Sequence, residues 1–597
     1  MATRIGDIDI LFTDSHRDCE NIWMPFRQET IVLPSGWQKD EGRKPMPVEV
    51  IWDRNVPIAL RDNVTIYGDV FRPSRSEVEP VAAVLPWSPF GKTGTGKQSL
   101  DRLPWRIGVP RNATSGLEKW EGPDPAEWCG RGYAVVNVDP RGTFDSEGDS
   151  YVYGTQEGRD GYDTIEWIAE QSWCNGSVAL VGNSWLGTTQ WFIAAERPPH
   201  LKAIAPWEGL GDHYRESICR GGIPSPHFWN WLLATFGGKN KREDVTQMVQ
   251  RYPLWNVYWE DKKPQLSKIE IPMYVLASYS TGLHTEGSLR GFLLSRSSEK
   301  WLRIHPTQEW YDQYQPENVN DLQRFLDRYL YGTLNGWEFM PRIRLSLLGY
   351  NRPNVVNRPV ESYPPSNFEF IDLYLDASSG QLSTIPAGKQ ASAKYFAENK
   401  GDSGCGFIHH FDKYTELCGF SRVELFMSTP DHDDMDVYVV IRKLDKDGRP
   451  LQSFNIPFES LPPGTTANDI PHENIFRYVG PNGRLRASHR ACGEEPGITQ
   501  QEQRLLSEGY VWHPHDREER LVTDQIVKLN IGLWAGGMLF DAGEAMRLDI
   551  LGSSPLVPEY EGLEDTVTNP NAGWHVIHTG GEYASKLRVA LSGITEE

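Results

Sequence analysis

The chain has 597 residues, more than one hydrophobic core can serve, so two or three domains are expected. Its formal net charge of −21 at pH 7 argues against nucleic acid and against an anionic membrane as partners. Hydrophobic residues make up 39% of the chain, and no apolar run is long enough to cross a bilayer.

The other compositional signals favour a cytoplasmic enzyme. Residues 1–20 have neither the basic nor the apolar region of a secretory signal, and the last residues carry no retention or peroxisomal address. The cysteines are odd in number and form no C-x-x-C pair, which fits reduced thiols and suggests no zinc site. They are Cys19, Cys129, Cys174, Cys219, Cys405, Cys418 and Cys492.

The first half of the chain alternates between strand and helix patterns. Residues 81–86 and 133–139 are short apolar runs typical of buried strands. Residues 160–170 have apolar side chains on one helical face and acidic residues in the first turn. Such alternation predicts a mainly parallel sheet that binds ligands at the carboxyl ends of its strands.

Residues 178–196 indicate a nucleophile elbow. The apolar run 178–181 leads into Gly182-Asn183-Ser184-Trp185-Leu186-Gly187, and a helical segment follows. A sharp turn from strand to helix, with small residues around it, exposes a serine hydroxyl at the top of an α/β-hydrolase sheet. The second glycine stands one place later than in the G-x-S-x-G pattern. We therefore expect Ser184 to be the nucleophile of such a sheet.

Two changes of pattern divide the rest of the chain. The alternation stops over residues 211–268, which are rich in tryptophan and helix-like, and a buried-strand signature resumes at residues 271–278. After about residue 340, short alternating runs at 370–375, 423–427 and 437–441 are separated by turn residues. We predict an α/β-hydrolase core (1–210 and 269–340), a helical cap (211–268) and a jelly-roll β-sandwich (341–597).

The motifs resemble those of the cocaine-esterase-like, X-prolyl dipeptidyl-peptidase-like hydrolases over nearly the whole chain. In the first half they are Asp139-x-Arg141-Gly142, Ser146-Glu147-Gly148, Asp160-Gly161-Tyr162-Asp163, Gln171-x-Trp173 and the elbow. In the second half they are Gly419-Phe420-Ser421-Arg422-Val423, Asp445-x-Asp447-Gly448, the run from Leu485 to Arg490, and His575-x-x-His578-Thr579-Gly580-Gly581. The resemblance implies the same three-part fold and hydrolysis of esters or amides through a Ser-Asp-His triad.

The chain departs from this family at three of four catalytic places. Where the family has its acid, after the strand at 273–277, no carboxylate occurs until Glu286. Where the family has its histidine, after the last strand, the chain has Glu309. The tyrosine that supplies an oxyanion donor in the family is replaced by Phe90. Of the four, Ser184 alone remains.

A triad can still be rebuilt with the roles exchanged. His284 lies on the former acid loop and Glu309 on the former histidine loop, so His284 is predicted to act as base and Glu309 to orient it. His305 is the rival base, and Asp312 is a substitute acid. The backbone N–H of Trp185 is the expected oxyanion donor. Lys92 and Thr93 lie on the loop of Phe90 and could supply another donor.

Two function classes follow. The first is a serine hydrolase or acyl-transferring enzyme that acts on an ester, thioester or amide of a bulky apolar substrate. The second is a non-hydrolytic enzyme of specialised metabolism, such as a cyclase, lyase or pericyclase, that uses the same pocket; a pure binding protein is a weaker third. Candidate substrate-binding residues are Phe90, Trp185, Trp207, Phe228, Trp229 and Trp231. No cofactor is implied, and the sequence leaves self-association and substrate identity open.

Overall fold

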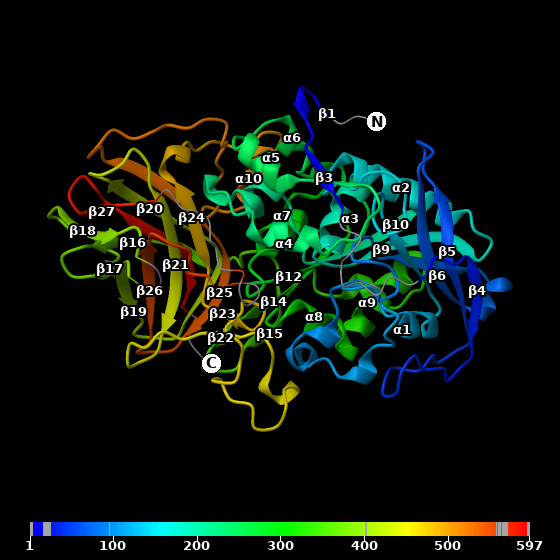
Figure 1. Cartoon of the computed structure of the whole chain (residues 1–597). Helices are drawn as coiled ribbons and strands as arrows, with labels where there is room; N and C mark the ends of the chain where they lie inside the picture. The colour runs from blue at the N-terminus through cyan, green and yellow to red at the C-terminus, as the bar shows by residue number, and fades with distance from the viewer. Residues whose placement is uncertain are drawn as a thin grey trace.

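The computed structural model describes residues 4–15, 25–94, 96–399, 403–556, 558, 563 and 571–593. Cys19 and Thr95, which belong to segments discussed above, lie outside the described residues. Within them, an α/β part and a strand-rich part lie side by side (Figure 1).

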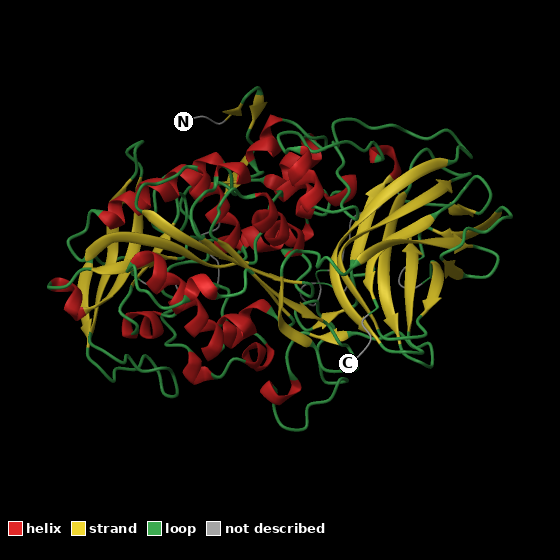
Figure 2. Ribbon diagram, turned by 180° about the vertical axis from the view of Figure 1, so that it is seen from behind, coloured by secondary structure: helices red, strands yellow, loops and turns green. Residues whose placement is uncertain are grey.

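A long mixed sheet runs through the α/β part (Figure 2). In the described residues its spatial order is β15-β14-β13-β12-β10-β9-β7-β8-β6-β5-β4, with parallel pairing from β8 to β14 and antiparallel pairing at both ends. The strands are β4 (Glu29–Leu33), β5 (Val50–Ala59), β6 (Thr65–Pro73), β7 (Val81–Leu85), β8 (Ala134–Asp139), β9 (Cys174–Asn183), β10 (Leu201–Trp207), β12 (Met273–Ser278), β13 (Lys300–His305), β14 (Ile343–Leu347) and β15 (Val355–Val360). Central strands such as β7 and β8 are buried along their full length, as parallel strands covered on both faces are.

Helices cover both faces of this sheet. The helices α2 (Thr155–Ala169), α3 (Trp185–Ala195) and α7 (Thr285–Leu294) pack on one face, and α1 (Pro125–Gly130) and α9 (Pro316–Leu330) pack on the other. Successive side chains of a strand point to opposite faces. Accordingly, Val81 and Ala83 of β7 belong to the first apolar cluster, and Ala82 and Val84 belong to the second.

The strand and helix patterns predicted before and around the elbow are confirmed by β7, β8, α2, β9 and α3. The boundary placed at residue 340 differs from the observed sheet, because β14 and β15 continue it to Val360. The reason is that β14 pairs with β13 in parallel, so the α/β sheet extends past residue 340, where the sequence pattern changes from alternating strands and helices to strands alone.

The segment 211–268 forms short, mostly helical elements above the carboxyl ends of the strands. They are η5 (Tyr214–Ile218), η6 (Arg220–Gly222), α4 (His227–Ala234), β11 (Lys241–Glu243), α5 (Val245–Arg251), α6 (Val257–Asp261) and η7 (Leu266–Lys268). Strand β11 pairs with β3 (Phe12–Asp14), which ties the amino-terminal segment to the cap. Strands β1 (Arg4–Ile5) and β2 (Ile8–Asp9) form a small hairpin beside it.

The carboxyl-terminal part is a β-sandwich (Figure 2). Its strands are β16 (Glu369–Asp376), β17 (Gln381–Ser383), β18 (Ala391–Phe396), β19 (Cys405–His410), β20 (Thr415–Ser428), β21 (Asp436–Leu444), β24 (Asn482–Arg486), β25 (Val527–Phe540), β26 (Ala545–Leu551), β27 (Trp574–Thr579) and β28 (Lys586–Ser592). A separate ribbon, β22 (Ser453–Phe454) with β23 (Arg477–Tyr478), and helix α10 (Gln500–Leu505) lie in its long connections. The predicted runs at 370–375, 423–427 and 437–441 are confirmed within β16, β20 and β21.

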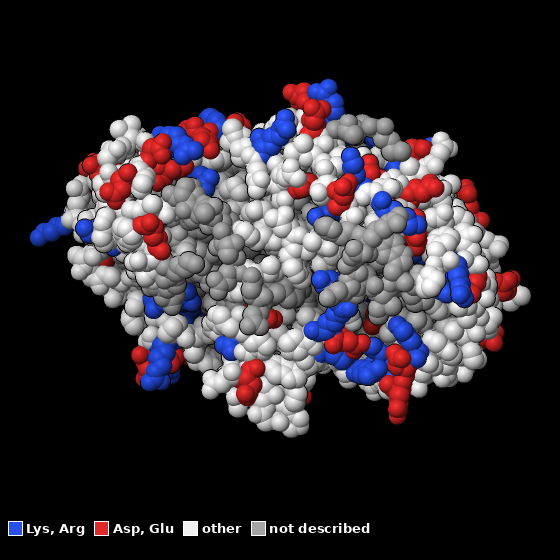
Figure 3. Space-filling view, viewed as in Figure 1, with Lys and Arg blue, Asp and Glu red and all other residues white. Residues whose placement is uncertain are grey.

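The surface carries both signs of charge. On the face drawn in Figure 3, Lys and Arg side chains are interspersed with Asp and Glu. The net negative charge is therefore not gathered into one patch on that face. Across the described residues, no helix combines the length and the apolar character that a bilayer crossing needs.

Candidate active site

Ser184 lies at the turn between β9 and α3, in a backbone conformation that is rare for a residue with a side chain. Its φ is 56° and its ψ is −116°. Its backbone N–H donates to the Glu208 carbonyl oxygen at 2.7 Å, and its own carbonyl accepts from the Thr188 N–H at 2.8 Å. A strained conformation of this kind persists only where surrounding bonds enforce it, and it is typical of functional turns.

The glycine three places after Ser184 has a steric reason. A Cβ on Gly187 would lie 2.4 Å from the carbonyl oxygen of Glu208, the atom that also fixes Ser184. Gly182 has a φ of 137°, and a Cβ there would lie 2.5 Å from the Leu186 side chain. The elbow therefore packs directly against the end of β10, which accounts for the late position of the second glycine.

His284 and Glu309 meet in the loops after β12 and β13. His284 Nδ1 lies 3.1 Å from Glu309 Oε2, and both side chains are buried. His284 directly precedes α7, and Glu309 is the first residue of α8 (Glu309–Gln313). The Asn183 side-chain amide donates to the Glu309 carbonyl at 3.3 Å, so the residue before the nucleophile also anchors α8.

The two partners shift one another's protonation. Burial by itself would lower the pKa of His284, but the Glu309 carboxylate outweighs it, and Glu208 adds to the effect, so the pKa is raised. Burial raises the pKa of Glu309, and His284 offsets part of that rise. The pair is thus suited to hold a proton on the imidazole when one arrives there.

Ser184, His284 and Glu309 line one cavity of about 80 Å³. His284 Nε2 has no hydrogen-bond partner in the described part of the chain, and neither does the Ser184 hydroxyl. The hydrogen bond between them that a triad requires therefore stays a prediction. The other lining residues are Phe90, Gln98, Trp120, Glu121, Phe228, Trp231, Leu232, Thr281, Leu283, Gln308, Trp310, Asn455, Asn474 and Ile475. The last three come from the β22–β23 region, so the sandwich part supplies one wall.

The rival base and the substitute acid are engaged elsewhere. His305 Nε2 forms a hydrogen bond with Glu208, and its other nitrogen lies 3.4 Å from the Thr307 hydroxyl. Asp312 accepts from the Arg303 guanidinium, with one bond at 2.9 Å. Neither His305 nor Asp312 lines the cavity. This second network lies behind the first and braces β13.

Phe90 lines the cavity, and the residues proposed to compensate for it do not. Lys92 Nζ lies 2.6 Å from the Asp139 carboxylate, and the Thr93 hydroxyl donates to Asp69 at 2.6 Å. Both are buried, and their polar ends are committed to these partners. Trp185 is the first residue of α3, so its backbone N–H has no acceptor within the helix and is available to a ligand.

Of the aromatic residues predicted to bind substrate, Phe90, Phe228 and Trp231 line the cavity, and Trp185, Trp207 and Trp229 do not. The Trp185 indole N–H donates to Glu157 at 3.0 Å. The Trp229 indole N–H donates to the Ser217 hydroxyl at 2.6 Å. Trp207 belongs to the apolar cluster on the opposite face of the sheet, with α9. These three side chains are structural in this arrangement.

Three lining residues were not predicted from the sequence: Trp120 and Glu121, near the end of the loop between β7 and α1, and Trp310 of α8. Trp120, Glu121 and Trp310 line the cavity, and the Trp310 indole N–H donates to Glu121 Oε1 at 2.9 Å. No motif or spacing marks them in the sequence, because they come together only when α8 packs against that loop.

Three of the buried groups have the spacing of metal ligands. One ligand atom each from Glu208, His284 and Glu309 lies within 4.8 Å of the others. In this structure Glu208 already bonds His305 with one oxygen and accepts from the Ser278 hydroxyl at 3.1 Å with the other. His284 and Glu309 bond each other, and Glu208 bonds these two other residues. Because the ligand atoms already have hydrogen-bond partners, the group fits a hydrogen-bond network better than a cation site.

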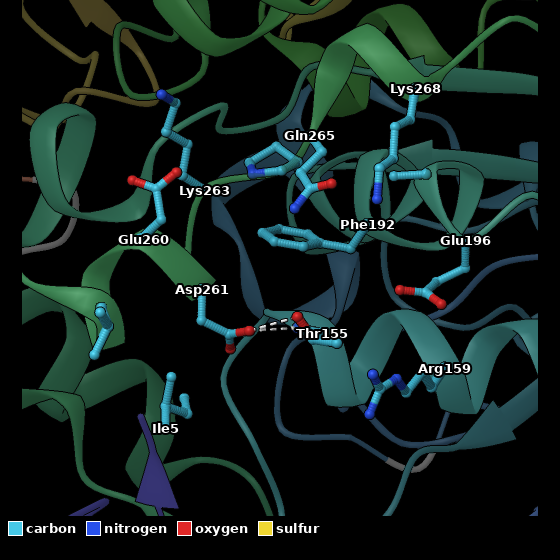
Figure 4. Close-up of a pocket in the computed structure, with 13 residues that line it drawn as sticks. Ile5, Thr155, Arg159, Phe192, Glu196, Glu260, Asp261, Lys263, Gln265 and Lys268 are labelled. Atoms are coloured by element: carbon cyan, nitrogen blue, oxygen red, sulfur yellow. Dashed lines mark hydrogen bonds between the residues drawn. The ribbon is translucent and has the colours of Figure 1, made fainter. Parts of the chain in front are cut away.

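A larger cavity of about 410 Å³ opens elsewhere, among α2, α3, α6 and η7 (Figure 4). Its walls carry charged groups of both signs, including Arg159, Glu196 and Lys268. Ser184 does not line it. The nucleophile, the imidazole and the aromatic side chains therefore single out the smaller cavity as the candidate active site.

Comparison with known proteins places this site in a family. The model of the X-Pro dipeptidyl-peptidase (S15 family) matches residues 62–250, and that of the X-Pro dipeptidyl-peptidase C-terminal non-catalytic domain matches residues 335–588. A crystal structure of a CocE/NonD family hydrolase from Staphylococcus aureus is 31% identical, with a TM-score of 0.82, and covers 97% of this chain and 98% of that one. The chain belongs to the CocE/NonD hydrolase family.

Two curated relatives match this CocE/NonD family member over shorter stretches. A cocaine esterase from a Rhodococcus species is 35% identical over 27% of this chain and 24% of its own length. A protein named as a Xaa-Pro dipeptidyl-peptidase of Streptomyces avermitilis is 23% identical over 35% of this chain and 36% of its own length. The chain thus spans about a quarter to a third of these curated relatives. The resemblance to this family stated from the motifs is confirmed, as is the α/β-hydrolase fold with a strand-rich carboxyl-terminal domain.

Proposed function

We propose that this protein is a serine hydrolase or acyl-transferring enzyme that acts through Ser184 on an ester, thioester or amide of an apolar substrate. The observation that carries the proposal is the buried pair of His284 and Glu309, 3.1 Å apart, in the cavity that also exposes the strained Ser184. Membership of a hydrolase family supports it.

The proposed chemistry assigns one role to each group. Ser184 Oγ attacks the substrate carbonyl, and His284 Nε2 accepts the hydroxyl proton and later delivers it to the leaving group. Glu309 holds the proton on Nδ1 and stabilises the imidazolium that forms. The Trp185 N–H donates to the oxyanion as charge develops on the carbonyl oxygen. Water or another nucleophile then releases the acyl group from Ser184.

The substrate class is proposed from the cavity walls. Aromatic and aliphatic side chains from three regions line the cavity with Ser184. They include Phe90 from the core, Phe228 and Trp231 from helix α4 of the cap, and Ile475 from the β22–β23 region. Such a lining favours an apolar acyl or alkyl group. The cavity of about 80 Å³ takes only a small group as it stands, so we expect a larger group to require movement of lining side chains such as Phe228 and Trp231.

A fluorophosphonate probe tests the proposal, because it reacts only with an activated serine. We expect the protein to be labelled on Ser184 and to release nitrophenol from short nitrophenyl esters, and Ser184→Ala to lose both properties. An unlabelled wild-type protein that keeps activity on a native substrate after Ser184→Ala would instead favour the non-hydrolytic class of enzyme.

A further inference from the structure

Glu121 is a buried acid in the candidate active site that the triad does not use. It lines the cavity with Ser184, His284 and Glu309, and only 3% of its surface is exposed. Its Oε1 accepts from the Trp310 indole N–H at 2.9 Å, whereas its Oε2 is buried with no hydrogen-bond partner. A buried oxygen without a partner is costly unless it serves a ligand.

The backbone of Glu121 is fastened to the elbow. Its carbonyl oxygen accepts from the Asn183 N–H at 3.3 Å and from the Gln313 side-chain amide at 3.1 Å. Its φ of 66° is unusual for a residue with a side chain. Because Asn183 directly precedes the nucleophile, the position of Glu121 relative to Ser184 is set by backbone contacts rather than by a mobile loop.

The surroundings of Glu121 favour its neutral form. Burial raises its pKa well above the usual range, and the nearby Glu309 carboxylate raises it further, while the indole N–H groups of Trp310 and Trp120 partly oppose this. Tyr153 and Tyr314 also lie near enough to feel its charge, and no ion pair involves Glu121 in the part of the chain that the structure describes. Two buried carboxyl groups that line one cavity do not both ionise readily, and Glu309 has the imidazole to stabilise its charge.

We propose that Glu121 is a further catalytic residue, a neutral carboxylic acid whose Oε2–H donates a hydrogen bond to the substrate oxyanion in place of the hydroxyl that Phe90 lacks. No proton is transferred in this role. The carbonyl π electrons move to the oxygen as Ser184 Oγ attacks, and the Glu121 O–H and the Trp185 N–H stabilise that charge together. The inference rests on the proposed hydrolase function.

The experiment compares Glu121→Gln with Glu121→Ala in the full-length protein. The glutamine can still accept from Trp310 with its oxygen and donate to the oxyanion with its amide, whereas alanine does neither. We expect Glu121→Ala to lower kcat on nitrophenyl esters about 10²-fold with little change in KM, and Glu121→Gln to keep most of the wild-type rate. Thermal unfolding of both variants identifies any loss that is due to misfolding.

The pH profile and the infrared spectrum give readouts that a merely structural role would not move. When Glu121 ionises at alkaline pH, its hydrogen-bond donor becomes an acceptor, so kcat of the wild type is expected to fall with rising pH. Glutamine does not ionise, so kcat of Glu121→Gln should not show this alkaline fall. The infrared spectrum of the wild type minus that of Glu121→Gln is expected to show the carbonyl stretch of a protonated carboxylic acid, because only the wild type has that acid at position 121.

Three outcomes would overturn the inference. The first is unchanged kcat in a folded Glu121→Ala. The second is an equal loss of kcat in both variants, which would show that a hydrogen-bond donor at this position is not what the reaction needs. The third is the absence of the infrared band. If the fluorophosphonate does not label Ser184 at all, the hydrolase proposal fails, and the role of Glu121 fails with it. The infrared band needs no substrate, so its presence would still show that Glu121 is protonated, and its absence would show that the protonation state was wrong.

Discussion

His284 and Glu309 lie on the loops after β12 and β13, in the reverse of the order that the family resemblance implies, and their side chains meet, with Nδ1 and Oε2 3.1 Å apart. The two side chains can meet because β12 and β13 are adjacent and parallel, so the loops that follow them leave the same edge of the sheet. A base and its orienting acid can be swapped between two such loops without loss of the triad's geometry.

Removal of the base is predicted to abolish turnover. We expect His284→Ala to lower kcat/KM on nitrophenyl esters by about 10³-fold or more, because Ser184 is a poor nucleophile without a proton acceptor. Steady-state kinetics and probe labelling measure the loss. His200→Ala is the control, since His200 pairs with Glu166 away from the cavity and its loss should leave the rate unchanged. Full activity in His284→Ala would contradict the swapped triad.

The pH dependence should report the same pair. The pKa of His284 is raised by Glu309 and Glu208, and the base must be neutral to act. Activity is therefore expected to fall as the pH drops through a value above the usual 6.5 of histidine. In Glu309→Gln the carboxylate is lost and burial dominates, so this acid limb moves to lower pH while the maximal rate falls. An acid limb that Glu309→Gln leaves in place would assign it to another group.

A hydroxyl restored at position 90 is predicted to accelerate ester cleavage. Phe90→Tyr adds a hydroxyl donor to the cavity wall, where the family resemblance implies one, and a single oxyanion donor is worth about 10²–10³ in turnover. We expect kcat to rise by roughly tenfold or more at similar KM. The gain is smaller than the full worth of a native donor, because no neighbouring group orients the new hydroxyl. If Glu121 supplies the missing donor, the gain is larger in Glu121→Ala than in the wild type. Equal gains in both backgrounds would mean that the two positions act independently.

Helix α4 should control the size of the acyl group. Phe228 and Trp231 are three residues apart and lie on one face of α4, beside the nucleophile. Trp231→Ala is expected to shift the preference among nitrophenyl esters toward longer chains, through a lower KM for those substrates. Trp574→Ala, a partly exposed tryptophan of the sandwich, serves as the control. The same chain-length profile in Trp231→Ala and wild type would place the acyl group elsewhere.

The elbow's second glycine should be a stability determinant. Alanine normally favours a helix over glycine by about 1 kcal/mol, but a Cβ at Gly187 would lie 2.4 Å from the Glu208 carbonyl oxygen. We expect Gly187→Ala to destabilise the protein by roughly 2–3 kcal/mol in urea unfolding, and to lose activity. Gly388→Ala, which has open space around its Cβ, should change stability little. A Gly187→Ala protein as stable as the wild type would show that β10 can move away from α3.

Part of the active site was readable from local sequence because it depends on local geometry. The elbow is set by a strand, a turn and a helix that are contiguous in the chain, and β7, β8, β9, α2 and α3 follow from apolar periodicity. The same periodicity also distinguishes Trp207 and Trp229, which do not line the cavity, from the side chains that do. Trp207 shares the strand face of Ala203 and Ala205, which packs toward α9, and Trp229 lies about 100° around α4 from Phe228.

The rest was decided by tertiary packing. Whether the imidazole of His284 turns toward Glu309 or toward solvent depends on how α7 and α8 pack, and no local pattern encodes that choice. Glu121 enters the site because Asn183 and Gln313 hold its backbone from two distant segments, and its protonation depends on burial, which only the folded chain creates. The sequence by itself therefore determined the fold and the elbow that carries Ser184, whereas contacts between remote loops selected the groups that surround it.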